Sequence, residues 1–124
     1  MPNQTQEEAL QLQERLFAEA LEIMTKKRLD YSGAADPYGN FRLSEPMAGV
    51  ESWRGVLVRL GDKFSRIRYI MERGGVRYVQ SETLWDVFCD VLNYSCILAG
   101  LCIEELGDQL VASGQKEANV RDVR

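Results

Sequence analysis

The feature that most constrains the fold is a stretch of helical periodicity between residues 53 and 71. Apolar residues recur there at intervals of three and four, the pattern of an amphipathic helix with one face turned to a core. They are Trp53, Val56, Leu57, Leu60, Phe64, Ile67 and Met71. Gly74 and Gly75 follow and are typical of a helix end. A helix with so continuous a stripe must pack against other elements, so we expect the chain to fold around it.

Two further helices are expected on either side. Thr5 and Glu8 form a capping-box pattern, which predicts a first helix from about residue 6 to 28. A third helix is expected from about residue 82 to 106, with Ser81 as its N-cap. The sequence therefore predicts an all-α fold.

The chain has 124 residues, of which 45% are hydrophobic and 27% are charged, as in a single globular domain. We expect a compact bundle of three long helices over residues 1 to 112, with a short C-terminal helix as an option near Leu110. Residues 113 to 124 are polar and predict a flexible tail. Between the first two helices, residues 29 to 46 lose the periodicity and predict a long loop of the kind that carries binding groups. Residues 76 to 80 predict a short extended segment.

The charge and composition of the chain limit the classes of partner and the cellular compartment that we expect. The net charge is −4, so duplex nucleic acid is a poor partner, although a local basic patch stays open. The longest nearly apolar stretch, residues 94 to 103, is about half of what a membrane-spanning helix needs. Cys89, Cys96 and Cys102 are odd in number and share one stretch, which predicts reduced core thiols. We expect a cytoplasmic protein that does not bind membranes.

The chain contains no histidine, which removes imidazole metal sites and serine–histidine or cysteine–histidine nucleophiles. Any catalysis would depend on carboxylates, lysine, tyrosine or a bound metal. Candidate carboxylates lie on the third predicted helix, where Glu82, Asp86, Asp90 and Asn93 follow one another at spacings of four, four and three. Like charges at such spacing repel, so a positive partner should face this line. It is either Mg²⁺ or the basic face of the second helix, which could form ion pairs with these carboxylates and leave no cofactor site.

Four motifs in this order resemble a known family. They are KRLDYSG at 27–33, DPYGNFR at 36–42, VRLGDKFSR at 58–66, and Glu82 followed by Asp86, Asp90, Asn93 and Tyr94. Together they resemble the first type of nucleotide-modification-associated domain of phages and bacteria. The last helix also resembles that of MazG-like all-α pyrophosphatases, which use Mg²⁺ to split nucleoside triphosphates into monophosphate and pyrophosphate. The resemblance implies a phage or prophage setting, in nucleotide metabolism or DNA modification.

The resemblance also implies roles for individual residues. The metal-binding and catalytic group would be Asp62, Glu82, Asp86 and Asp90, holding one or two Mg²⁺ ions. The nucleotide-binding group would be Lys27, Tyr31, Asn40, Phe41, Arg59, Lys63, Arg66 and Asn93. The departure from the pyrophosphatases is on the second helix, where they usually carry a glutamate cluster and this chain has Asp62 among basic residues.

Three hypotheses follow. The first is a Mg²⁺-dependent hydrolase of a nucleoside triphosphate or related nucleotide. The second is a nucleotide binder without chemistry, such as a phage protein that sequesters a nucleotide. The third is a helical assembly protein. A homo-oligomer is expected in any case, because three amphipathic helices carry more apolar surface than one small bundle covers.

Overall fold

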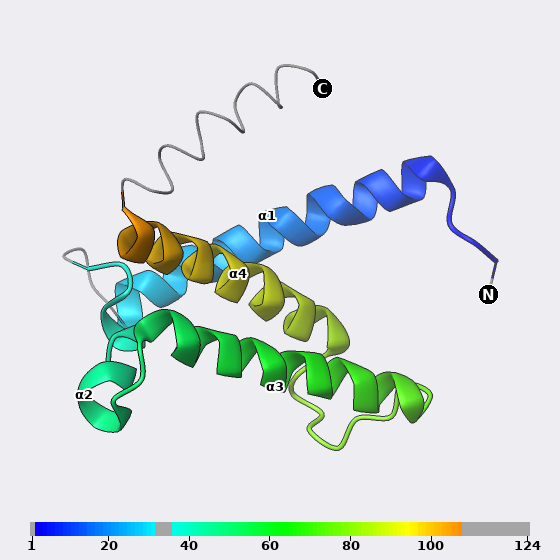
Figure 1. Ribbon diagram of the computed structural model, residues 1–124. Helices are drawn as coiled ribbons and strands as arrows, with labels where there is room; N and C mark the ends of the chain where they lie inside the picture. Colours follow the sequence, from blue (N-terminus) through cyan, green and yellow to red (C-terminus); the bar gives the residue numbers. More distant parts are fainter. Residues whose placement is uncertain (1, 32–35, 108–124) are drawn as a thin grey trace.

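The computed structural model describes residues 2–31 and 36–107, and within them the chain is helical with no strand. The elements in chain order are α1 (Gln6–Tyr31), the short 3₁₀ helix η1 (Gly39–Phe41), α2 (Ser44–Ala48), α3 (Ser52–Glu72) and α4 (Leu84–Leu106). Figure 1 shows α4 running between α1 and α3, with η1 and α2 gathered at one end of the bundle. The prediction of an all-α bundle of three long helices is confirmed.

Helix α4 is the central element because it packs against both α3 and α1. The main core lies between α3 and α4, where Val56 and Leu60 meet Ile97 and Leu101. The contact of α4 with α1 is smaller and includes a buried polar link. There the buried Asn93 side chain donates a hydrogen bond to the carbonyl oxygen of Ala20 at 2.9 Å.

The start of α4 differs from the prediction. Thr83, rather than Ser81, is the N-cap, and its hydroxyl accepts from the backbone N–H of Asp86 at 3.2 Å. In return, the Asp86 carboxylate accepts from the backbone N–H of Thr83 at 2.8 Å, which completes a capping box. Glu82 therefore precedes the helix instead of forming its first turn. The capping box predicted for Thr5 and Glu8 at the start of α1 is confirmed.

The described residues of the predicted loop at 29–46, namely 29–31 and 36–46, contain helical structure that the sequence did not predict. Helix α1 continues to Tyr31, and the following segment forms η1 and α2. Residues 76 to 80, where a short extended segment was expected, form no helix and no strand. The short C-terminal helix and the tail at 113–124 lie outside the described residues.

The structure bears on two features from which a cytoplasmic location was predicted, the cysteines and the apolar helix α4. Cys89 is buried as predicted, but Cys96 is exposed and Cys102 is half-buried, so the three thiols do not share one core; all three are free. Within the described part of the chain, α4 is long and apolar enough by length and composition to cross a membrane. The same two properties belong to a helix packed between two others, which is how α4 lies here. The cytoplasmic location stays a prediction.

Candidate functional site

A pocket of about 290 Å³ lies where α1, η1, α3 and α4 come together. Its lining residues are Met24, Lys27, Arg28, Pro37, Asn40, Phe41, Arg59, Asp90, Asn93 and Tyr94. Each of the four sequence motifs contributes to this list, although they are far apart along the chain. Six of the residues singled out from the sequence therefore line one pocket, namely Lys27, Asn40, Phe41, Arg59, Asp90 and Asn93.

One wall of the pocket is aromatic. The rings of Phe41 and Tyr94 meet edge to face, with centroids 6.1 Å apart and planes at 83°. The guanidinium of Arg59 lies over the Phe41 ring, 5.0 Å from its centroid. This arrangement holds a cation beside a flat apolar surface, which suits a ligand with both an anionic and a planar part.

The charge of the pocket is positive. Its lining has three cationic side chains, Lys27, Arg28 and Arg59, and one carboxylate, that of Asp90. Asp90 is already paired, because its two carboxylate oxygens lie 3.4 Å from Lys27 Nζ and 2.9 Å from Lys63 Nζ. The remaining positive charge attracts an anion.

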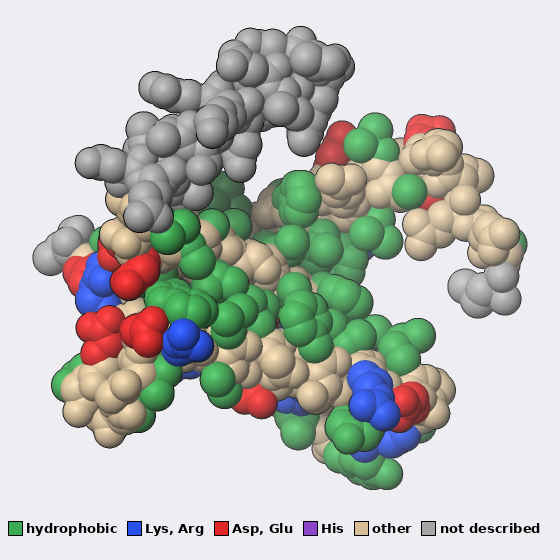
Figure 2. Space-filling view, viewed as in Figure 1, with side chains coloured by type: hydrophobic (Ala, Val, Ile, Leu, Met, Phe, Trp, Pro, Cys, Tyr) green, Lys and Arg blue, Asp and Glu red, His purple; other side chains and the backbone are tan. Residues whose placement is uncertain are grey.

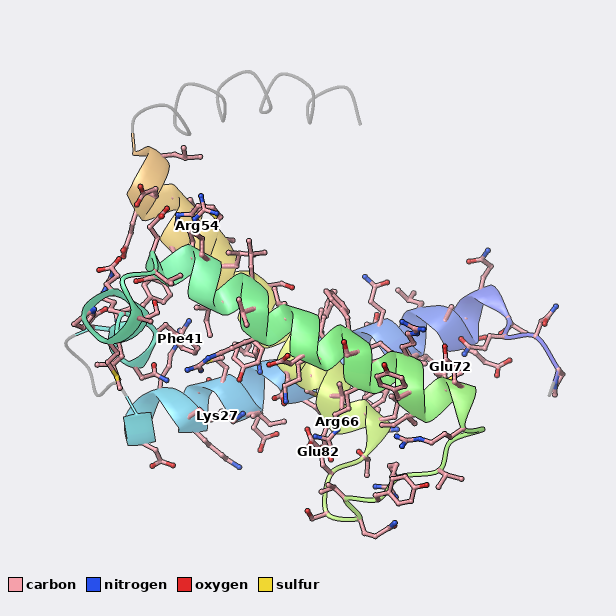
Figure 3. All side chains as sticks on the ribbon, turned by 60° about the horizontal axis from the view of Figure 1, so that its bottom comes forward. Lys27, Phe41, Arg54, Arg66, Glu72 and Glu82 are labelled. Carbon is pink, nitrogen blue, oxygen red and sulfur yellow. The ribbon has the colours of Figure 1, made fainter. Side chains whose placement is uncertain are left out.

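A second hollow of about 320 Å³ adjoins the pocket and shares Arg59 and Tyr94 with it. Its other lining residues are Asp62, Lys63 and Arg66. Two of these residues are paired with Glu82, whose carboxylate oxygens lie 2.8 Å from Arg66 Nη1 and 3.6 Å from Lys63 Nζ. Figure 3 shows the Arg66 and Glu82 side chains directed toward one another beneath α3.

Lys63 is thus the shared partner of Glu82 and Asp90, two of the carboxylates predicted to bind Mg²⁺. Burial by itself would lower the pKa of Lys63, but the hydrogen bond and the negative charge of Asp90 outweigh it and raise the pKa above its usual value. The ammonium group therefore stays charged between the two carboxylates at neutral pH.

The four predicted metal ligands do not converge. Glu82 and Asp90 face lysine and arginine, while the Asp86 carboxylate belongs to the capping box of α4. The hydrogen bonds from the backbone N–H and the hydroxyl of Thr83 hold the pKa of Asp86 below its usual value. Asp62 is exposed on α3. Over residues 2–31 and 36–107 no three acidic or cysteine side chains are grouped so that they could hold a metal ion. As placed, these residues do not fit a Mg²⁺ site, and the ion-pair alternative describes their contacts.

The loop that supplies Asn40 and Phe41 is fastened to α4 at two points. The phenol ring of Tyr38 lies over Gly100, where a Cβ atom would come within 2.5 Å of Tyr38 Cζ and closer still to the hydroxyl oxygen. Arg42 bridges Asp36 of the same loop at 2.7 Å and Glu104 of α4 at 2.8 Å. These anchors were not predicted as functional residues, although both lie in the DPYGNFR motif.

Some residues of the pocket were not predicted from the sequence, and one predicted residue has a side chain outside the described structure. Arg28 and Pro37 line the pocket without having been predicted to do so, and their membership in the first two motifs was the available signal. Tyr94 has two roles, since it packs on the core and forms a pocket wall. Tyr31 is the last residue of α1, and its side chain lies outside the described structure.

The meeting of all four motifs at one pocket is the main result for this site. The family resemblance that these motifs suggest, and the Mg²⁺ that it implies, stay predictions. Comparison of the chain with protein-family models, with curated proteins and with solved structures finds no match.

Proposed function

We propose that this protein binds a nucleotide in the pocket between α1, η1, α3 and α4. The observation that carries the proposal is the combination of three cationic side chains and two aromatic rings around one cavity whose single carboxylate is already paired. A phosphate supplies the anion that such a pocket lacks, and a nucleobase supplies the flat surface that packs against rings.

The phosphate would lie among Lys27, Arg28 and Arg59. Arginine offers a planar fork of N–H donors that matches phosphate oxygens, and lysine offers a compact point charge. The Lys27 side chain is 45% exposed even while it contacts Asp90, so its ammonium group can turn to a ligand at little cost. Phosphate binding would therefore draw on side chains from two different helices.

The base would lie against Phe41 and Tyr94, with amide groups at its edge. Asn93 uses its side-chain N–H₂ group for the Ala20 carbonyl, so its side-chain oxygen is the atom presented as an acceptor. Asn40 lines the same wall from the loop. Two amides beside a stacking surface suit hydrogen-bonded recognition of a base edge.

Binding without a protein-held metal ion is favoured over Mg²⁺-dependent hydrolysis. For Glu82 and Asp90 to bind Mg²⁺, Lys63 and Arg66 would have to leave contacts of 2.9 Å and 2.8 Å. Asp86 would have to leave the capping box of α4. Hydrolysis to a monophosphate and pyrophosphate stays the alternative that the sequence resemblance suggests.

A panel of nucleotides tests the proposal by thermal shift, in EDTA and in Mg²⁺, followed by analysis for pyrophosphate. We expect stabilisation by at least one nucleotide in EDTA and no product. Stabilisation that requires Mg²⁺, together with released pyrophosphate, would replace this proposal by the hydrolase. No stabilisation by any member of the panel would contradict both.

We also propose that two copies associate through the exposed apolar faces of α1 and α4. On α1, Leu10, Phe17 and Leu21 are 57%, 51% and 66% exposed and lie at spacings of seven and four, on one side of the helix. Figure 1 shows the N-terminal part of α1 extending past the other helices, and Figure 2 shows apolar side chains gathered over α4 between α1 and α3. In a two-fold dimer the same patch of both copies meets, so this face of one copy would be covered by the same face of the other.

Light scattering over a range of concentrations tests this association. We expect a dimer that Leu21→Glu converts to a folded monomer. A wild-type chain that is monomeric at all concentrations would contradict it.

A further inference from the structure

The basic surface does not end at the pocket. It continues along α3 with Arg59, Lys63 and Arg66, and into the following segment with Arg73 and Arg77. The first three are spaced by four and three, which places them on one side of the helix, and Arg73 follows two turns later on the same side. The cations therefore form a track rather than a cluster.

Shared lining residues place the hollows along this track next to one another. Arg59 lines both the nucleotide pocket and the second hollow, and Arg66 lines both the second hollow and a third one of about 230 Å³. The third hollow is formed by Arg66, Ile70, Arg73, Arg77, Tyr78 and Val79. This lining has three guanidinium groups and, among the described residues, no carboxylate. Three neighbouring hollows thus follow one another from the pocket to the far end of α3.

Charge is segregated on this path. The chain as a whole has a net charge of −4, yet the second and third hollows are lined by five basic residues and by one acidic residue, Asp62. In the middle of the track, Lys63 and Arg66 are already paired with carboxylates, those of Glu82 and Asp90. At the far end, Arg73 and Arg77 have no carboxylate within ion-pair distance in the described structure. Arg77 donates instead to the backbone carbonyl oxygens of Gln80 and Glu82. Positive charge at the two ends of the track, Arg59 at one and Arg73 with Arg77 at the other, favours an extended anionic partner.

An exposed aromatic ring lies beside this far end. Tyr78 is 78% exposed, and the guanidinium of Arg73 lies over its ring at 4.8 Å from the centroid. Exposed rings interleaved with arginine are the elements that proteins use to stack the bases of single-stranded nucleic acid. The track therefore has an aromatic surface at each end, Phe41 and Tyr94 at the pocket and Tyr78 at the other.

We propose that this track binds single-stranded nucleic acid, with one nucleotide in the pocket and the phosphates of the adjoining strand along α3. The pocket end of this proposal rests on the nucleotide-binding function proposed above. Arg59 and Arg73 are fourteen residues apart along the helix, which corresponds to about 21 Å at about 1.5 Å per residue. That length accommodates a few nucleotides, the lower range for sites of this kind. A base in the pocket must leave the stack, so a single strand fits better than a duplex.

Fluorescence anisotropy with a labelled oligothymidylate of about ten nucleotides tests the track. We expect the Arg73→Gln/Arg77→Gln variant to bind it roughly fivefold more weakly than wild type. The slope of log affinity against log salt should fall by about 1.4, because each phosphate contact on a single strand contributes about 0.7. The control is Arg54→Gln, an exposed arginine on α3 that pairs with Glu51 and lines none of the three hollows.

Titration of a mononucleotide in parallel separates this proposal from the function of the pocket. Both stand if the double variant loses oligonucleotide affinity and keeps mononucleotide affinity. The track is refuted if the double variant matches Arg54→Gln, if the duplex of the same length binds as tightly, or if the oligonucleotide does not bind at all. Oligonucleotide binding that depends on Arg73 and Arg77, without any mononucleotide binding, would uphold the track and refute the pocket.

Discussion

Replacing Gly100 by alanine should expose the role of the loop anchor on α4. Two effects oppose each other. Alanine in a helix interior is more favourable than glycine by up to about 1 kcal/mol. Against this, the new Cβ atom would lie 2.5 Å from Tyr38 Cζ, so the half-buried phenol ring must move off the helix. Full burial of an aromatic ring is worth about 1.5 to 3 kcal/mol, and the half-buried Tyr38 ring about half of that.

The loss of Tyr38 packing therefore offsets or exceeds the gain in helix propensity. We expect Gly100→Ala to change the free energy of unfolding by between about 0 and −1 kcal/mol. In a Tyr38→Ala background the clash is gone, and the same substitution should stabilise by up to about 1 kcal/mol. The sign of the effect thus depends on Tyr38, as in a double-mutant cycle with strong coupling.

Urea denaturation of the four proteins in this cycle measures the effect. Gly61→Ala is the matched control, because Gly61 lies within α3 and a Cβ atom there meets nothing within 4 Å. It should stabilise by up to about 1 kcal/mol. If Gly100→Ala stabilises the wild-type chain as much as Gly61→Ala does, Tyr38 does not lie over Gly100 and the account of the anchored loop is wrong. Displacing the ring should also weaken nucleotide binding, because Asn40 and Phe41 belong to the same loop.

Three further predictions concern the helices around the site. Asp86→Ala removes the capping box of α4 and should cost about 1 kcal/mol at pH 7. The pKa of Asp86 is lower in the folded than in the unfolded state, where it is about 3.9. The loss of stability caused by Asp86→Ala should therefore be constant above that pH and vanish as the pH falls through the folded-state pKa. Denaturation at several pH values measures it. Asn93→Leu should destabilise by about 1 to 3 kcal/mol, because it removes the buried hydrogen bond to Ala20 that links α4 to α1; an unchanged urea midpoint would refute this. Lys63→Met should destabilise the fold by about 1 to 2 kcal/mol at low salt, because it leaves the half-buried Glu82 and Asp90 without their shared cation. An unchanged free energy of unfolding would mean that the two carboxylates do not depend on Lys63.

The long helices could be predicted because their apolar residues have a clear period. The helix predicted from Trp53 to Met71 is confirmed as α3, which ends one residue beyond it. Its predicted core face is only partly confirmed: Val56 and Leu60 are buried, whereas Leu57, Phe64 and Met71 are exposed. The start of α4 was placed wrongly because Ser81 and Thr83 are both good N-cap residues. The available signal was the residue three positions later, which is Leu84 for Ser81 and Asp86 for Thr83.

The helices η1 and α2 could not be predicted from local sequence. They depend on tertiary contacts, namely the fit of Tyr38 over Gly100 and the bridge from Arg42 to Glu104. Neither contact leaves a periodic trace in the segment itself. Loops fixed by distant side chains are where sequence patterns carry least information.

For the site, the sequence identified the residues better than their roles. The need for a cation opposite Glu82 and Asp90 was correctly anticipated, and Lys63 and Arg66 provide it. The additional contact of Lys27 with Asp90 depends on how α1 crosses α4, which periodicity does not specify. The separate role of Asp86 follows from the position of the N-cap, so the error in the start of α4 extended to the predicted metal site.

The most direct test of the central claim is calorimetric titration of a nucleotide into the protein in the presence of EDTA. The account predicts binding to the wild-type chain, at least about tenfold weaker binding to Arg59→Gln, and unchanged binding to Arg54→Gln. Equal affinities for the Arg59→Gln and Arg54→Gln variants, or binding that disappears in EDTA, would contradict it.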